Sequence, residues 1–155
     1  MPTEIERKFL VTNDDWKRLV TRRTRVRDGL IASSNGRKVR VRIENDRATV
    51  AIKGARKGPA RSEYEYEIPV DDAEELLTMC DRTLEKDRHY VEDEGTLWTV
   101  DVYDGVLKGV VIAEVELDRE DQELKLPGWI SMEVTGDPRY SKINMSSAAR
   151  KLLSL

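Results

Sequence analysis

The amino-acid sequence predicts a mainly β protein of the α+β class, with its strands arranged as an antiparallel barrel or sandwich and with peripheral helices. About eight runs of residues alternate between two kinds of side chain, as the two faces of a strand do. Turns rich in Gly, Asn and Asp separate many of these runs at the regular spacing of antiparallel strands. Several runs also combine an apolar face with a face of formal charges, which is unusual for the dry interior of a small barrel.

Length and composition limit the kinds of protein that this chain can be. Its 155 residues fit a single domain, residues 1–155, that is long enough to bury a substantial core. Charged residues make up 37% of the chain but the net charge is only −3, which argues against binding to nucleic acid through a uniformly basic face. Cys80 is the only cysteine, which excludes an internal disulfide and a cysteine-cluster zinc site. No long apolar run indicates a membrane span, so we expect a cytoplasmic enzyme or binding protein with no membrane partner.

The first predicted strand lies near the N-terminus and shows the two-faced pattern most clearly. Glu4, Glu6 and Lys8 share one face, whereas Ile5 and Phe9 lie on the other. Two carboxylates about 7 Å apart along a strand repel each other unless a cation lies between them. The lysine at the next position on the same face suits a negatively charged group held by that cation.

The strand that begins at Lys38 is equally regular, with Val39 and Val41 on one face and Arg40 and Arg42 on the other. The predicted strands cover residues 4–11, 27–32, 38–43, 49–53, 63–68, 84–91, 97–103 and 110–117. Residues 54–61 form a basic loop rich in Gly and Pro.

Helices are predicted outside the sheet. Thr12 or Asn13 can cap a first helix that carries Trp16 and Leu19 on its apolar side and extends to Arg23. Two more helices are predicted at residues 71–79 and 146–153, the second being a C-terminal helix, and the polar residues 118–126 are a further helix candidate.

The charged faces suggest what the sheet encloses. If the apolar faces pack outward against the helices, the charged faces line a wet central channel. Carboxylates bind Mg²⁺ or Mn²⁺ through oxygen, and Arg and Lys bind phosphoryl oxygens, so this mixture suits a ligand made of a metal and an anion. The alternative is that the charges face solvent and pair across strands for some tenths of a kcal/mol each. That alternative is a less natural account of like-charged neighbours such as Arg40 and Arg42.

The motif Glu-x-Glu-x-Lys at residues 4–8 resembles the opening signature of the CYTH superfamily, the triphosphate tunnel metalloenzymes. In the form EIERKFLV it is most similar to the small bacterial members. The resemblance covers nearly the whole chain and continues through Arg40-x-Arg42, Lys53, Glu63-Tyr64-Glu65, Glu85-Lys86-x-Arg88, Asp101-Val102-Tyr103, Ala113-Glu114-Val115-Glu116 and residues 129–137.

This resemblance implies an eight-stranded antiparallel β-barrel, a tunnel that binds triphosphate groups with Mg²⁺ or Mn²⁺, and a C-terminal helix that can plug one mouth. By matching positions, the metal ligands would be Glu4, Glu6, Asp101, Glu114 and Glu116. The catalytic residues would be Lys8, Glu63, Glu65 and Glu114. The residues that bind substrate would be Lys8, Arg40, Arg42, Lys53, Lys86, Arg88, Arg139 and Lys142.

Two positions depart from the pattern that the resemblance implies. Bacterial tripolyphosphatases of this family commonly carry Tyr after Gly in the second strand, where this chain has Leu30 after Gly29. The usual pairing of a tyrosine with the motif lysine, Lys8, is therefore absent. The family also usually carries Asn at the position of Lys142.

We therefore expect a metal-dependent hydrolase that releases phosphate from inorganic tripolyphosphate, or from an organic or nucleoside triphosphate, by attack of metal-activated water. A class IV adenylate-cyclase-like enzyme is the enzymatic alternative, although no adenine pocket is recognisable. A noncatalytic polyphosphate- or nucleotide-binding protein is the alternative from another class, and the departure at Leu30 leaves it open. Nucleic acid is not an expected partner because few aromatic side chains lie on the charged faces. The expected partner is a small-molecule triphosphate, and a homodimer is compatible with the predicted fold.

Overall fold

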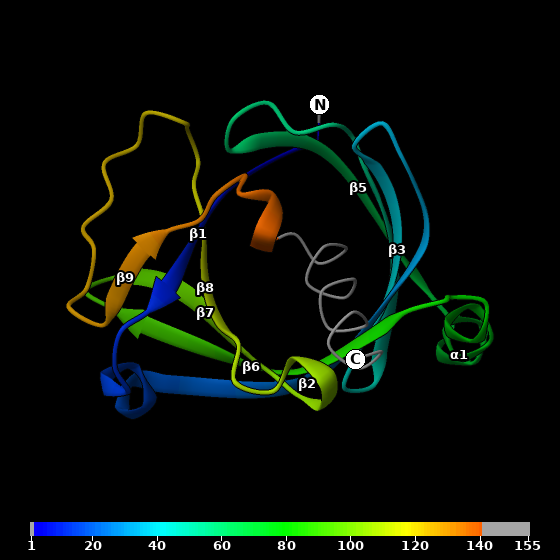
Figure 1. The fold of residues 1–155 in the computed structure, drawn as a ribbon, viewed down its shortest axis with the longest axis horizontal. Coiled ribbons are helices and arrows are strands. Elements are labelled where there is room, and N and C mark those ends of the chain that lie inside the picture. Colours follow the sequence, from blue (N-terminus) through cyan, green and yellow to red (C-terminus); the bar gives the residue numbers. More distant parts are fainter. Residues whose placement is uncertain (1, 141–155) are drawn as a thin grey trace, which may run out of the picture.

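The computed structural model describes residues 2–140, and its strands close into a ring (Figure 1). The strands are β1 (Thr3–Val11), β2 (Val20–Ser34), β3 (Arg37–Glu44), β4 (Arg47–Lys53), β5 (Ala60–Ile68), β6 (Thr83–Asp93), β7 (Thr96–Tyr103), β8 (Val111–Glu116) and β9 (Ile130–Glu133). The described helices are α1 (Val70–Thr78) and the short 3₁₀ helices η1 (Asp15–Leu19), η2 (Gly105–Leu107) and η3 (Pro138–Tyr140).

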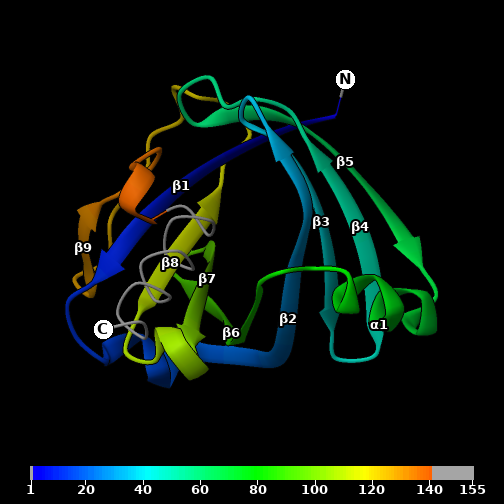
Figure 2. The ribbon, with the colours of Figure 1, turned by 45° about the vertical axis from the view of Figure 1, so that its right-hand side comes forward.

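Eight antiparallel strands form the ring in the order β5-β4-β3-β2-β6-β7-β8-β1, and the start of β1 pairs with β5 to close it. The closing contact joins residues 3–5 to residues 60–62, and the following part of β1 pairs with β8. The ninth strand, β9, lies outside the ring against the end of β1 (Figure 2). The predicted eight-stranded antiparallel barrel is therefore confirmed.

Two of the hairpins that connect the ring have turns with a left-handed backbone. Asn35 and Gly36 have φ of 51° and 78°, and Glu94 and Gly95 have φ of 49° and 80°. Positive φ at both central residues is the signature of the type I′ turn, whose twist matches that of two antiparallel strands. These turns keep β2 beside β3 and β6 beside β7 without an intervening loop.

The largest apolar core lies on the outer surface of the ring. Phe9, Trp98 and Val115 point outward from β1, β7 and β8, and Trp16 and Trp129 cover them from η1 and from the segment before β9. The aromatic rings pack edge to face, with centroids 5.7 Å apart for Phe9 and Trp98 and 5.5 Å for Trp98 and Trp129. Because the apolar faces pack outward, the opposite faces of these strands are left to line the interior of the barrel.

Helix α1 covers a second part of the outer surface, over β3 and β4. Its Ala73 and Leu77 are buried against Val41, Ile43 and Ala48. The predicted helix at residues 71–79 is therefore confirmed to within one residue at each end. No helix among the described residues is long and apolar enough to span a lipid bilayer.

A third apolar cluster faces inward and fills part of the barrel. Leu84, Tyr103 and Ile112 come from β6, β7 and β8, and Leu107 of η2 packs against them. The interior is therefore apolar in this region and charged elsewhere, which the sequence pattern did not predict.

Three predictions of local structure differ from the observed elements. The predicted first helix is only the five-residue η1, because β2 begins at Val20 and pairs with β6 through residues 20–29. The same strand continues through residues 26–34 to pair with β3, which makes it the longest of the ring. Residues 118–126 contain no helix, and β9 was not predicted. The predicted C-terminal helix at residues 146–153 lies outside the described residues.

Gly29 in β2 approaches the end of α1 too closely for any larger residue. A Cβ atom there would lie 2.6 Å from Sγ of Cys80 and 2.7 Å from Cδ2 of Leu77. We expect Gly29→Ala to lower the free energy of unfolding by about 1–3 kcal/mol, because the side chains of Leu77 and Cys80 must move out of their packed positions. Gly128→Ala is the matched control, since a Cβ added at Gly128 would meet no atom of residues 2–140 within 4 Å. Urea denaturation checks both variants, and equal stabilities would contradict this account.

Candidate active site

The barrel encloses a cavity of about 970 Å³ that opens to solvent. Each strand of the ring places at least one side chain on its wall, drawn mainly from the inward set of alternating residues. The predicted site residues on the wall are Glu4, Glu6, Lys8, Arg40, Arg42, Lys53, Glu63, Glu65, Arg88, Glu114 and Glu116. Residues from β1 and from β8, which are more than 100 positions apart in the sequence, thus meet those of β3 and β4 in one space.

Three predicted site residues among residues 2–140 do not lie on this wall. Lys86 and Asp101 are completely buried, with exposed fractions of 1% and 0%, and do not reach the cavity. The side chain of Arg139 is mostly exposed and pairs with Asp137 at 2.7 Å. Lys142 lies outside the described residues.

The carboxylates converge where β1 meets β8. Glu6 and Glu116 are directly opposite each other in the strand register, so their side chains project from the same face at neighbouring positions. Glu4 precedes Glu6 by two residues in β1 and lies on the same wall. The pKa of Glu116 is raised by burial and then by Glu4, Glu6, Glu63 and Glu114, in that order. Like charges in this position destabilise the strand pair unless a cation joins them.

Two lysines lie between pairs of these carboxylates. Lys8 Nζ is 3.7 Å from Glu6 and 3.9 Å from Glu114, which is its direct partner in the register of β1 and β8. Lys53 Nζ is 3.2 Å from Glu4 and 3.1 Å from Glu63, its direct partner in the register of β4 and β5. Burial opposes the charge on Glu63, yet its pKa is lowered by a hydrogen bond with Glu4 and by Lys53. The carboxylate of Glu63 therefore stays ionised beside Lys53.

Arginines form the opposite wall. Arg42 is buried, and its guanidinium donates two hydrogen bonds, of 2.7 and 2.9 Å, to the carboxylate of Asp28 on the adjacent strand. Burial and the neighbouring Arg42 lower the pKa of Arg40. Within residues 2–140, Arg40 forms an ion pair with the exposed Glu65, at a distance of 3.5 Å. The Nε atom of Arg40 is buried and has no hydrogen-bond partner within the same residues. A buried donor left without an acceptor costs free energy, and a phosphate oxygen would remove that cost.

Lys86 and Asp101 instead belong to a buried ionic network behind the wall. Lys86 Nζ lies 2.8 Å from Asp101 and 3.6 Å from Asp28. Arg88 donates two hydrogen bonds of 2.9 Å to Asp101 and reaches the cavity itself. Lys86 and Asp101 were predicted to bind substrate and metal, and the structure places both side chains behind the cavity wall, so these two roles stay predictions. They are covered because Tyr103, the direct partner of Lys86 in the register, and Ile112, the direct partner of Asp101, both belong to the buried inward cluster.

The wall also carries charged residues that the sequence analysis missed. They include Asp28, Lys38, Arg56 and Arg61. Lys38 has the same parity in β3 as Arg40, so the alternation could have found it. Asp28 required knowledge of the long strand β2, and the positions of Arg56 and Arg61 depend on the loop between β4 and β5.

The chemistry of the donors fits a divalent cation at Glu4, Glu6 and Glu116. These residues provide only carboxylate oxygens, which Mg²⁺ and Mn²⁺ prefer, and the like-charged pair of Glu6 and Glu116 needs a counter-charge. Within residues 2–140, no three Asp, Glu, His or Cys side chains already form a compact metal cage. The carboxylates of Glu4 and Glu6 contact Lys8, Lys53 and Arg56 instead.

Comparison of the sequence with known proteins agrees with this geometry. The profile of the CYTH domain matches residues 2–147. The inorganic triphosphatase of Acetivibrio thermocellus is 44% identical over 147 residues, which are 94% of this chain and 94% of that protein. The inorganic triphosphatase of Nitrosomonas europaea is 34% identical over 143 residues, or 89% of this chain and 93% of that protein.

Solved structures have the same barrel. The crystal structure of an inorganic triphosphatase superposes with a TM-score of 0.66 at 32% identity and covers 94% of this chain and 95% of its own. A putative adenylyl cyclase from Hippeastrum, described as having a dominant triphosphatase activity, superposes with a TM-score of 0.61. It is only 15% identical and covers 75% of this chain and 80% of its own, so it supports the fold alone.

The buried network predicts how stability depends on pH. Burial by itself would raise the pKa of Asp101, but Lys86 and Arg88 lower it to about 2. In the unfolded chain the pKa of an aspartate is about 3.9, so the network stabilises the fold above that pH and loses its contribution as the pH falls toward 2. We expect Asp101→Asn to cost about 3–5 kcal/mol near neutral pH, because Lys86 and Arg88 are left without a buried counter-charge.

Denaturant unfolding between about pH 5 and about pH 2 measures this difference. The gap between the wild type and Asp101→Asn should narrow as the pH falls. Asp121→Asn is the matched control, because Asp121 is highly exposed and pairs with the equally exposed Arg119. A gap that stays constant across this pH range would contradict the assigned role of Asp101.

Proposed function

The chain belongs to the CYTH domain family, and we propose that it is a triphosphatase that hydrolyses a terminal phosphoanhydride bond. Inorganic tripolyphosphate is the substrate that we propose first, because both of the relatives described above are inorganic triphosphatases. The observation that carries the proposal is the division of the cavity wall. Carboxylates gather on β1 and β8, and Arg40, whose buried Nε has no acceptor within residues 2–140, lies on β3 across the ring (Figure 1).

The basic residues of the wall would bind the substrate. Arg40 presents a guanidinium fork, which matches the oxygens of a phosphoryl group better than an ammonium does. Arg88 also lies on the wall, but two of its donors already bind Asp101, so only its remaining donors are available. Arg42 is held in place by Asp28, so its remaining donors have a fixed direction. Lys8 and Lys53 would add charge on the side where the carboxylates lie, close to the phosphoryl group that is transferred.

Glu4, Glu6 and Glu116 would hold a divalent cation. Such a cation neutralises phosphate oxygens and lowers the pKa of water when it is bound. The chain itself would align the substrate for in-line attack by water on the terminal phosphorus. Glu63, Glu65 or Glu114 would accept the proton of that water, and the bond to the bridging oxygen would break to release orthophosphate and pyrophosphate. Lys8, which lies between Glu6 and Glu114, would stabilise the charge that develops on the departing oxygen.

The cation that we propose is Mg²⁺ or Mn²⁺, since all of the candidate ligands are carboxylates. A cytoplasmic location agrees with the single cysteine, Cys80. A homodimer would use the outer face of β4 and β5, where Ile52 and Tyr66 are exposed.

Phosphate release from tripolyphosphate, thiamine triphosphate and ATP, with Mg²⁺ and then with Mn²⁺, tests the proposed activity. We expect metal-dependent release from tripolyphosphate. Glu6→Gln should lower turnover by at least about tenfold, because it removes one ligand charge while it keeps the shape of the side chain. Glu120→Gln, at an exposed position in the segment before β9, is the matched control. Wild-type turnover and metal dependence in Glu6→Gln would overturn the metal assignment.

Leu30 gives a second test, because it lies on the cavity wall next to Arg40 in the strand register. Its apolar side chain can neither carry a proton nor hydrogen-bond to Lys8. We expect Leu30→Tyr to raise the turnover of tripolyphosphate at alkaline pH, where a tyrosine–lysine pair can lose a proton. Leu30→Phe is the control for size. A folded Leu30→Tyr variant that binds tripolyphosphate and gains no turnover would show that Leu30 only packs against the wall.

A further inference from the structure

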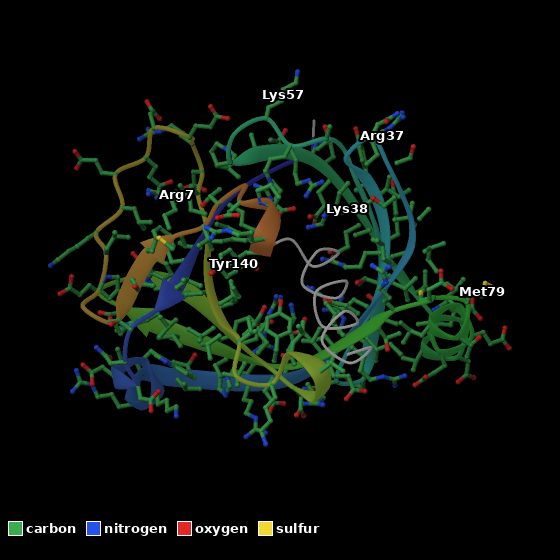
Figure 3. All side chains as sticks on the ribbon, in the orientation of Figure 1. Arg7, Arg37, Lys38, Lys57, Met79 and Tyr140 are labelled. Carbon is green, nitrogen blue, oxygen red and sulfur yellow. The ribbon has the colours of Figure 1, made fainter. Side chains whose placement is uncertain are left out.

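A second like-charged pair faces the cavity, and it is basic. Lys38 of β3 and Lys53 of β4 are directly opposite each other in the strand register, and both line the wall. Figure 3 shows Lys38 directed into the ring, whereas the adjacent Arg37 points outward. Like charges in directly opposed positions destabilise a strand pair, so each of them calls for a compensating charge.

The two lysines differ in how they are compensated. Lys53 lies between Glu4 and Glu63, at 3.2 and 3.1 Å. Lys38 forms no ion pair within residues 2–140, although the protein removes part of its side chain from water. A half-buried ammonium without a carboxylate is an unusual arrangement that an anion would stabilise.

The charged groups that act most strongly on Lys38 come from four other parts of the fold and are basic. They are Arg61 of β5, Lys8 of β1, Lys53 of β4 and Arg56 of the loop between β4 and β5, while β2 places the uncharged Ser33 opposite Lys38. Glu4, Glu6 and Glu63 lie beside these cations and pair with Lys53 and Arg56. Burial, followed by these four cations, lowers the pKa of Lys38 to about 8. Lys38 is therefore close to losing its proton near physiological pH.

The two arginines are held in position largely by backbone carbonyl groups. Arg61 is buried, and its guanidinium donates to the carbonyl oxygens of Gly54 and Gly36 at 2.8–3.1 Å. Arg56 donates to the carbonyl of Pro59 at 3.2 Å and lies 3.7 Å from Glu6. Carbonyl oxygens fix these side chains without cancelling their charge, and the contact of Arg56 with Glu6 compensates only part of it, so positive charge is concentrated between the β2–β3 hairpin and the β4–β5 loop.

We propose that Lys38, together with Arg56 and Arg61, forms an anion subsite that binds a phosphoryl group at this end of the cavity and that releases it when Lys38 loses its proton. The inference deepens the proposed triphosphatase function and rests on it for the identity of the ligand. Lys38 is assigned as a phosphoryl-binding residue, and Arg61 as a positioning residue that holds the hairpin against the loop. The phosphoryl group belongs either to the bound triphosphate or to released orthophosphate, and the two sources share the same chemistry.

The direction of the pH effect follows from linkage. An anion binds the protonated form of Lys38 more tightly, so binding raises the pKa of the ammonium above its value of about 8 in the free protein. Affinity should therefore be full below about pH 8 and should fall as the pH rises above it. A guanidinium at the same position keeps its charge over this range and should remove this part of the pH dependence.

Calorimetric titration of a nonhydrolysable triphosphate analogue, in the presence of Mg²⁺, tests the proposal in the whole 155-residue chain. Between about pH 7 and about pH 9.5 the wild type should lose roughly tenfold more affinity than Lys38→Arg. The ionisation of the analogue changes equally in both titrations, so the difference reports the protonation of Lys38. Lys38→Met should bind more weakly than the wild type at the lower pH and equal it at the higher pH. Lys57→Met is the matched control, because Lys57 is exposed and lies away from the ring interior in Figure 3.

A parallel titration with inorganic phosphate identifies the source of the phosphoryl group. If Lys38→Met weakens phosphate binding and leaves analogue binding unchanged, the subsite holds the released product. If it weakens analogue binding, the subsite holds substrate. Equal affinities of wild type, Lys38→Met and Lys38→Arg for both ligands at both pH values would overturn the proposal.

The outcome is separable from that of the proposed function. Binding is measured without turnover, so a wild type that binds the analogue with the expected pH profile but hydrolyses no triphosphate supports the subsite and rejects the enzyme. If the wild type hydrolyses tripolyphosphate, but Lys38→Met binds the analogue and phosphate with the affinity and pH dependence of the wild type, the subsite is rejected and the enzyme is not. Thermal melting of the ligand-free variants checks folding, and Lys38→Arg keeps the test decisive if Lys38→Met is unstable.

Discussion

The structure depends on how charges that face one another across neighbouring strands are compensated inside the barrel. Opposed residues project from the same face at close range, so every inward charge acts directly on its partner. Several inward pairs join opposite signs, as Lys8 does with Glu114 and Arg88 with Asp101. Glu6 with Glu116 and Lys38 with Lys53 instead join like signs. The acidic pair calls for a cation and the basic pair calls for an anion, which are the two components of a metal–triphosphate complex.

A charged interior is possible because the barrel does not rely on it for its hydrophobic core. The ring buries its large apolar side chains on the outside, where Trp16 and Trp129 cover Trp98 and where α1 covers β3 and β4. Burial of apolar area stabilises the fold there. The wall of the cavity can then hold groups whose repulsion and incomplete hydrogen bonding would be too costly if they had to form the core itself.

The buried network and the cavity wall divide the charged residues into two kinds. Asp28, Lys86 and Asp101 neutralise one another and hold Arg42 and Arg88 in fixed orientations. Arg40 and Lys38 lack such full neutralisation within residues 2–140 and are available to a ligand. Rigid support behind the wall and uncompensated charge on it together favour binding of a highly charged anion without a large rearrangement.

Alternation along the chain was enough to assign the two faces of most strands, and therefore which residues could point inward, since it is a local property of the backbone. The pattern placed Glu4, Glu6 and Lys8 on one face and indicated an antiparallel barrel or sandwich, whereas the resemblance of the Glu-x-Glu-x-Lys motif and the motifs after it indicated the family. Which inward residues reach the cavity depended on the packed fold. Asp101 and Lys86 alternate correctly and yet lie under Tyr103 and Ile112, because cover depends on neighbours from other strands. Likewise, residues 20–26 form a strand because β6 is there to pair with them, and Glu6 meets Glu116 only when β1 pairs with β8. Local turns can fix the register between consecutive strands, but the pairings of β1 with β8 and of β2 with β6 join residues far apart in the chain, and a local pattern does not specify them.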